Sequence, residues 1–452
     1  MPAVKEAGTP SSYPPRKGEV LLETCRLRLS SRHGPKWPGK HEMDEAMRHS
    51  TFRCWQTVLR LRTAALALLG VMVFGASSAQ WIPNETQVSP QADLIDYEFS
   101  QARAQITWND ELGNLWIGGV DRTTGLFVPA DGRDILVDPD AMRFEDAQKT
   151  KNGPEWVSTA GGDVIVYTKY AGAHSDNNSR IGLAQPDANG VWSGGFLGPE
   201  GATRKAPYGS MSKNDPAPRI TYVDNKENHY WRELFDPATE QLITDFPASN
   251  YPIRHVRGAR AVAYPLTVGD TDQIFYRNLD TGKVTQLTFD AGNKYEVWMW
   301  KAPEFANELI FMTLVDQIEL RVYRKLARPS DGVKVWTPIY SQMAPGGNKI
   351  FSPEPFTWNG KSYVFMAQSV RGNKFRSEIW IANIDVANPV FRRITDNTLL
   401  RTRTDPEVFI TKSGPRIYYN RLVPDYSSGN PRSCREPACS EGVWMADPGP
   451  LP

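Results

Sequence analysis

Six acidic residues that adjoin prolines are the clearest candidates for chemistry in this 452-residue sequence. Each follows or precedes a proline: Glu155, Glu304, Glu354 and Glu407 come directly after one, and Asp215 and Asp405 directly before one. Carboxylates that cluster raise one another's pKa, and such a group acts as an acid and a base or holds a cation or sugar hydroxyls. The alternative is that each is a consensus residue at the start of a strand, bonded to neighbouring backbone.

Histidine gives a second candidate. After residue 79 the histidines are His174, His229 and His255. His174 lies in the polar stretch AGAHSDNNS, so we expect an exposed loop residue suited to proton transfer, whereas His229 adjoins a Tyr-Trp pair typical of packing. No two have metal-site spacing, and no phosphate loop, Rossmann glycine pattern or Gly-x-Ser-x-Gly elbow is present. We predict no metal site and no cofactor, while noting that clustered carboxylates suit a divalent cation.

A repeating unit positions these residues. A strand-like segment recurs about every 52 residues as AQITW, VIVY, RITY, AVAY, LIFM, YVFM and IYY, which end at Trp108, Tyr167, Tyr222, Tyr264, Met312, Met366 and Tyr419. A loop and a second strand follow each, and the second strand often ends at an aspartate in a turn: Asp121, Asp187, Asp236, Asp280 or Asp385. Four short antiparallel strands per unit are typical of a β-propeller blade.

The fold class is therefore all-β, and we predict a seven-bladed propeller. Seven units close into a ring if the segment 81–88 (WIPNETQV) supplies the outer strand that the last unit lacks, which also hides two sheet edges. Six blades are the alternative, should the second and third units merge, and a β-sandwich is the other all-β arrangement. The Pro-Glu motifs would then meet where the innermost strands begin, as an acidic ring around the central channel.

The repeating units resemble the WD40-like propeller repeats of TolB-type proteins, strongly in the last four units and weakly in the second and third. The likeness rests on GKVTQLTF with a following PEF, and on FRRITDN followed by DPEVF and PRIYYN, and it covers most of residues 96–446. The family's Ser-Pro-Asp-Gly after the aromatic is replaced here by STAGGD, ANE, WNGK and TKSG. The resemblance implies a propeller that serves as a binding scaffold, without identifying its partner.

Two segments, KAPEFANELIFM and SPEPFTWNGKSYVFMA, are also similar to parts of propeller-fold glycoside hydrolases. That resemblance implies an acidic residue as general acid. Trp298, Trp300 and Trp358 nearby would offer flat faces for a sugar ring, although aromatic residues in blades usually belong to the core. A polysaccharide lyase that uses a histidine is the related alternative.

The N-terminal region predicts export. Arg53, Arg60 and Arg62 precede an apolar run too short to span a bilayer, and small residues at 77 and 79 fit processing before Gln80. We therefore expect a dispensable or mis-annotated leader at 1–46, a signal peptide at 47–79 and a single propeller domain at 80–452, with no membrane span after cleavage. The destination is secreted or periplasmic, where Cys434 and Cys439 would form a local disulfide.

The formal net charge of +1 argues against a nucleic-acid partner, which requires a concentrated basic surface. The leading hypothesis is a monomeric scaffold that recognises a protein or glycan at its channel face. The alternative is a carbohydrate-active enzyme, and the sequence leaves open whether the protein is a catalyst.

Overall fold

The computed structural model describes residues 84–143, 152–198, 203–210, 217–244, 253–370, 376–385, 387–425 and 438–451. The chain divides into two units, Met1–Gln80 and Trp81–Pro452. The expected leader and signal peptide lie outside the described residues, as do Asp215 and Cys434, so export and the disulfide stay predictions. Within the described ranges, no helix is both long and apolar enough to cross a membrane.

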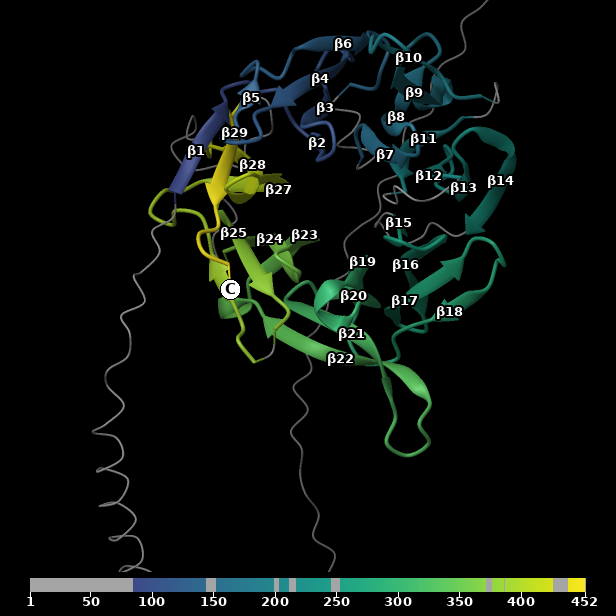
Figure 1. The fold of residues 1–452 in the computed structure, drawn as a ribbon, viewed down its shortest axis with the longest axis vertical. Coiled ribbons are helices and arrows are strands. Elements are labelled where there is room, and N and C mark those ends of the chain that lie inside the picture. The colour runs from purple at the N-terminus through teal and green to yellow at the C-terminus, as the bar shows by residue number, and fades with distance from the viewer. Residues whose placement is uncertain are drawn as a thin grey trace, which may run out of the picture. The chain divides into compact units, whose positions relative to one another are not determined.

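The second unit is a seven-bladed β-propeller, in which seven small antiparallel sheets surround a common centre (Figure 1). The first four blades contain the following strands: β2 (Glu98–Ser100), β3 (Gln105–Asn109), β4 (Leu115–Val120) and β5 (Phe127–Val128), with β6 (Ile135–Asp138) also paired to β4; β7 (Glu155–Thr159), β8 (Gly162–Tyr170), β9 (Ser179–Pro186) and β10 (Trp192–Phe196); β11 (Lys205–Gly209), β12 (Arg219–Val223), β13 (His229–Glu233) and β14 (Asp236–Thr244); β15 (Arg254–His255), β16 (Ala261–Val268), β17 (Thr271–Asn278) and β18 (Val284–Gln286).

Blades 5 to 7 are built from β19 (Lys294–Ala302), β20 (Glu308–Val315), β21 (Glu319–Ala327) and β22 (Lys334–Met343); β23 (Lys349–Trp358), β24 (Lys361–Ser369), β25 (Ser377–Asn383) and β26 (Phe391–Arg393); and β27 (Thr402–Thr411), β28 (Gly414–Leu422), β29 (Ser440–Asp447) and β1 (Asn84–Ser89). The 3₁₀ turns are η1 (Asp176–Asn178), η2 (Pro303–Phe305) and η3 (Pro345–Gly347). In blades 1 to 6 the first strand lies innermost and the chain proceeds outward (Figure 1).

The ring is closed by the two ends of the propeller, as the sequence predicts. β1 pairs with β29 as the outermost strand of blade 7, with Asn84 opposite Asp447. A buried ion pair fixes β1, because Arg403 Nε and Nη2 each lie 2.9 Å from a carboxylate oxygen of Glu85. The Arg403 side chain has no exposed surface and that of Glu85 is 7% exposed. The seven-blade prediction is confirmed. β1 covers the edge of β29 that would otherwise have unpaired backbone groups.

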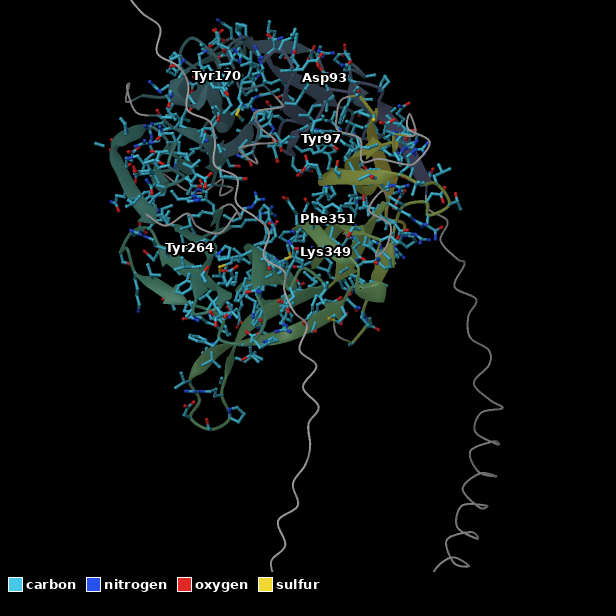
Figure 2. The ribbon with its side chains drawn as sticks, turned by 180° about the vertical axis from the view of Figure 1, so that it is seen from behind. Asp93, Tyr97, Tyr170, Tyr264, Lys349 and Phe351 are labelled. Atoms are coloured by element: carbon cyan, nitrogen blue, oxygen red, sulfur yellow. The ribbon has the colours of Figure 1, made fainter. Side chains whose placement is uncertain are left out.

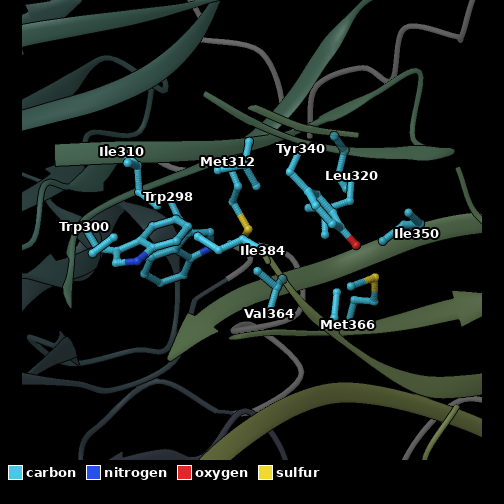
Figure 3. Packing of buried hydrophobic residues seen from close by; sticks show 14 of the residues in the cluster. Trp298, Trp300, Ile310, Met312, Leu320, Tyr340, Ile350, Val364, Met366 and Ile384 are labelled. Carbon is cyan, nitrogen blue, oxygen red and sulfur yellow. The ribbon is translucent and has the colours of Figure 1, made fainter. Parts of the chain in front are cut away.

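Apolar side chains fill the spaces between neighbouring blades. Middle strands are covered on both faces, so β24 reads SYVFMAQ with every one of these residues buried instead of alternating. Figure 3 shows the cluster between blades 5 and 6, where Trp298 and Trp300 of β19 pack near Met312, Val364 and Met366. Both tryptophans are only 3% exposed, so they are core residues and not sugar platforms.

Aspartate-led turns connect the outer strands as expected at four of five positions. A side-chain oxygen accepts the N–H of the residue two positions on at Asp121, Asp187, Asp236 and Asp385. At the fifth, Asn278 accepts from Asp280 N instead, while Asp280 lies 2.8 Å from Arg219 of the neighbouring blade. Asn and Asp both make such turns, which leaves Asp280 available for the ion pair.

Candidate functional site at the channel mouth

A cavity of about 210 Å³, which we call the channel mouth, lies at the centre of the ring and is lined by residues of the innermost strands or of the segments just before them. All seven blades contribute to its wall. The carboxyl side chains in the wall are those of Asp96, Glu98, Glu155, Glu296, Glu354, Asp405 and Glu407, and the remaining polar contributions include Asn152, Tyr208 and Arg254. Repetition of the blade therefore converts one position of the unit into a ring of functional groups.

Backbone bulges direct these side chains into the cavity. The pairing of the innermost strand with its neighbour shifts register at Tyr295/Val297, Phe351/Glu354 and Thr404/Glu407, and again in β11. The residues inside these shifts have left-handed backbones: Ala206, Glu296, Ser352 and Asp405, with φ between 46° and 54°. Asp96, just before β2, has φ 52°. A bulge bends its strand and re-aims a side chain, and non-glycine residues at positive φ concentrate at functional sites.

Burial makes these carboxyl groups hold protons unusually strongly. It raises the pKa of Glu155 to about 8, opposed by the lowering effect of Arg254. It raises the pKa of Glu354 to about 7 and that of Asp405 to about 6, with Arg254 again opposing both shifts. Glu155 is 4% exposed. A buried carboxylate loses hydration and gains little in return, which favours its neutral form.

Mutual repulsion adds to this effect in the deeper part of the ring. The pKa values of Glu98 and Glu407 are raised well above the usual range, first by burial and next by each group's negative neighbours. Among these neighbours, Glu155 has the largest effect on the pKa of Glu98, and Glu98 on that of Glu407. Because the groups interact, their protons come off as a coupled set. At neutral pH the ring is a mixture of carboxylic acids and carboxylates.

Arg254 supplies positive charge in the same wall. Its guanidinium carbon lies 4.8 Å from the ring centroid of Tyr208 and 4.3 Å from that of Trp298, and Nη2 lies 3.9 Å from Glu354. Arg257, on the same side, donates from Nη1 to the Pro355 carbonyl at 3.0 Å. Aromatic faces hold the Arg254 guanidinium in place without neutralising it. Arg254 is the one arginine among the described lining residues, and the buried guanidinium of Arg257 also lowers the pKa of Glu354, so seven carboxyl groups lie near two guanidinium groups.

The structure brings together four of the six predicted acidic residues. Glu155, Glu354, Asp405 and Glu407 line the cavity, and Asp215 lies outside the described residues. The prediction for Glu304 is wrong, because Pro303–Phe305 follows the end of β19 instead of opening it, which places Glu304 at the opposite end of the blade. There its carboxylate accepts from Ser362 N and Oγ at 2.9 and 3.0 Å. This is the structural role that the sequence left as the alternative.

The structure places His174 away from the acidic cavity, and its role as a candidate site residue stays a prediction. Its ring lies 4.6 Å from that of Tyr170 and is half-buried, and Tyr170 lies toward the outside of the ring (Figure 2). His174 does not belong to the cavity wall. Burial lowers the pKa of both His229 and His255 to about 4, so these two are neutral packed residues at physiological pH.

Sequence reasoning missed Asp96, Glu98, Glu296, Arg254 and Tyr208. Glu296 occupies the blade-5 position that was assigned to Glu304, but no proline adjoins it and its bulge has no local sequence pattern. Asp96-Tyr97-Glu98 directly precedes a repeat strand, as the other motifs do, and this spacing was the one available indication. In the described ranges no three His, Cys, Asp or Glu side chains are placed to hold a metal ion together.

Comparison with known proteins gives similarity of fold only. No family model and no curated protein matches the chain. Among solved structures, it is similar to a putative TolB from Agrobacterium tumefaciens, with 14% identity, a TM-score of 0.35, and 54% of this chain and 80% of that chain covered. TolB from Acinetobacter baumannii has 14% identity and a TM-score of 0.33, covering 68% and 83%. The Dos1 propeller has 9% identity and a TM-score of 0.42, covering 80% and 94%. Solved TolB structures are thus among those that resemble this seven-bladed propeller.

Proposed function

We propose that this protein is an exported binding scaffold that holds a basic segment of a partner protein at its channel mouth. The observation that supports this most directly is the convergence of seven blades on one cavity whose carboxyl groups outnumber its guanidinium. We expect the scaffold to act in a secreted or periplasmic setting, because the sequence predicts an export signal. The protein then acts as a monomer, because one ring is a complete site.

The charge of the wall selects the ligand. Carboxyl groups with raised pKa values are destabilised as anions, and an entering ammonium or guanidinium group relieves that repulsion. Charge-assisted hydrogen bonds to carboxylates are among the strongest in proteins. A cationic side chain that enters the ring therefore neutralises part of its negative charge and forms charge-assisted hydrogen bonds. A carboxylate ligand would instead add to the repulsion.

The size of the cavity selects the form of the ligand. About 210 Å³ is below the usual range of small-molecule pockets and suits one or two side chains. A folded domain would rest on the blade loops around the mouth and insert a lysine or arginine. This arrangement is that of a scaffold whose specificity comes from a central anchor.

A carbohydrate-active enzyme is the second candidate, and one observation favours it. Glu155 and Glu354, with pKa values of about 8 and 7, would be protonated near neutral pH as a general acid requires. Hydrolysis of an aryl glycoside panel that Glu155→Gln abolishes would establish this function in place of the scaffold.

The scaffold is tested by calorimetric titration with acetyl-trilysine amide at pH 8 and pH 5, and with the triglutamate peptide for comparison. Binding should be seen for the lysine peptide, and it should weaken at pH 5 because protonation removes negative charge. Asp405→Asn should weaken it at pH 8 about tenfold or more, which is the loss of one charge-assisted bond.

Glu111→Gln is the matched control. Glu111 is an exposed carboxylate in the β3–β4 turn at the same end of the ring but outside the cavity, and its loss should leave affinity within twofold. Equal binding of the two peptides, or equal effects of the two variants, would reduce the interaction to surface charge and refute the proposal.

A further inference from the structure

A second pocket lies at the opposite end of the propeller from the acidic cavity. Its volume is about 280 Å³, and it is formed between blades 6 and 7. β23 (Lys349–Trp358) contributes Glu354, its sixth residue, to the acidic cavity and Trp358, its last residue, to this pocket, so four residues of one strand separate the two sites. The β27–β28 turn and residues 447–451 form the rest of the wall.

The pocket contains an aromatic surface beside a paired charge. Trp358 packs partly buried against the core between blades 6 and 7 and also lines the pocket. Arg416 Nη2 lies 3.2 Å from Asp447, and the two side chains are 16% and 38% exposed. Arg416 also donates from Nη1 to the Pro415 carbonyl at 3.1 Å. Donors and acceptors therefore stand side by side, and their net charge is zero.

The wall is held in place before any ligand enters. Arg392 of β26 donates from Nη2 to the carbonyl of Pro450 at 2.7 Å, and also to that of Pro448. Asp447 Oδ1 accepts the Gly449 N–H at 2.8 Å, which fixes the turn after β29. A preorganised pocket loses little entropy when it binds.

Glycine shapes the turn beside the aromatic edge of the pocket. Gly414 has φ +120°, a conformation that L residues with a side chain rarely adopt, and a Cβ at this position would lie 3.9 Å from Trp358 Cζ2, an ordinary contact distance. The backbone conformation of the β27–β28 turn, and not a lack of space, therefore favours glycine here.

From this chemistry we infer that the pocket binds the terminal pyranose of a neutral glycan. The C–H face of a sugar ring packs on a flat aromatic surface, and an arginine-carboxylate pair offers a donor and an acceptor to adjacent hydroxyl groups. A charged ligand would gain little from a pair of zero net charge. The volume lies at the small end of ligand pockets, which suits the end of a chain. This site is independent of the proposed partner at the channel mouth.

The test is saturation-transfer NMR of the full chain with the methyl pyranosides of glucose, galactose, mannose and N-acetylglucosamine. At least one should receive saturation, strongest at the C–H protons of one ring face. Trp358→Leu keeps an apolar side chain for the core but removes the flat face. It should raise the dissociation constant for the sugar at least tenfold. Arg416→Gln should also raise the dissociation constant, because it removes hydrogen-bond donors. This variant is used for the test if circular dichroism shows that Trp358→Leu is not folded.

Asp405→Asn at the channel mouth is the control, because it should leave sugar binding unchanged. Absence of saturation transfer to all four sugars would overturn the inference. So would a signal that folded Trp358→Leu or Arg416→Gln leaves unchanged, or one that Asp405→Asn abolishes, since the last would locate the sugar at the acidic cavity. None of these results would bear on the lysine-peptide titration, so the two proposals fail separately.

Discussion

The burial of Glu155 in the ring makes its contribution to folding stability depend on pH. It is buried beside Asp96, Glu354 and Arg254, and its pKa is about 8. In the unfolded chain the same group ionises near its ordinary value of 4.5. Between these two values the folded state keeps a proton that the unfolded state releases, so this group's contribution to folding stability falls as the pH rises from about 4.5 to 8.

Glu155→Gln should therefore stabilise the protein at pH 8. Glutamine matches the shape of the neutral acid and cannot ionise, and one pKa unit corresponds to about 1.4 kcal/mol, so the gain at pH 8 should exceed about 1 kcal/mol. At pH 4.5 the gain should vanish. Chemical denaturation of both proteins at the two pH values measures this. A gain that is equal at both values would contradict the raised pKa, and Glu111→Gln should show no pH-dependent difference.

At the scale of the element, irregularity of the innermost strands shapes the wall of the cavity. A regular antiparallel pair would place alternate side chains on the two faces of the blade, between its neighbours. The bulges at Glu296, Ser352 and Asp405 break that alternation at the start of the strand. Three different residue types occupy this backbone conformation, which indicates that the blade architecture imposes it.

The attachment of β1 to blade 7 can be tested by a single substitution. Glu85→Leu would leave Arg403 buried without its carboxylate partner, and removal of one member of a buried pair costs about 3–5 kcal/mol. The double variant Glu85→Leu with Arg403→Met removes both charges and should recover much of that loss. Urea denaturation compares the two. Thr86→Ala, on the exposed side of the same strand, should change stability by less than about 0.5 kcal/mol.

If the single and double variants are equally unstable, the ion pair is not what holds β1, and packing of Val88 and Ser89 would be the stronger contribution.

At the scale of the molecule, the ring is a closed sheet system with one acidic mouth. Closure depends on a strand from the beginning of the propeller and three from its end. β1 does not line the cavity, whereas β2 and β27, from the two ends of the propeller, contact each other and both line it. The two ends of the propeller therefore meet at the acidic site.

A chain that begins at Pro90 should lose this closure. Without β1 the edge of β29 is exposed, and unpaired edges associate with other chains. We expect a melting temperature several degrees lower than that of a chain beginning at Asn84, together with oligomers in size-exclusion chromatography. A monomer of unchanged melting temperature would show that blade 7 is stable with three strands.

The amino-acid sequence by itself determined the all-β class, the repeating blade and the closing strand, because these follow from local periodicity, turn chemistry and a count of strands. It also identified Glu155, Glu354, Asp405 and Glu407, which adjoin prolines at the start of β7 or within β23 and β27. Glu304 has the same local motif but follows its strand, and only the pairing of β19 with β20 shows this. Glu296 and Arg254 were identified from tertiary structure alone, and Trp358, which the sequence also suggested, is separated from the buried Trp298 and Trp300 only by its pocket, because a bulge, a cation between two aromatic rings and a pocket between two blades depend on contacts that no short stretch of sequence encodes.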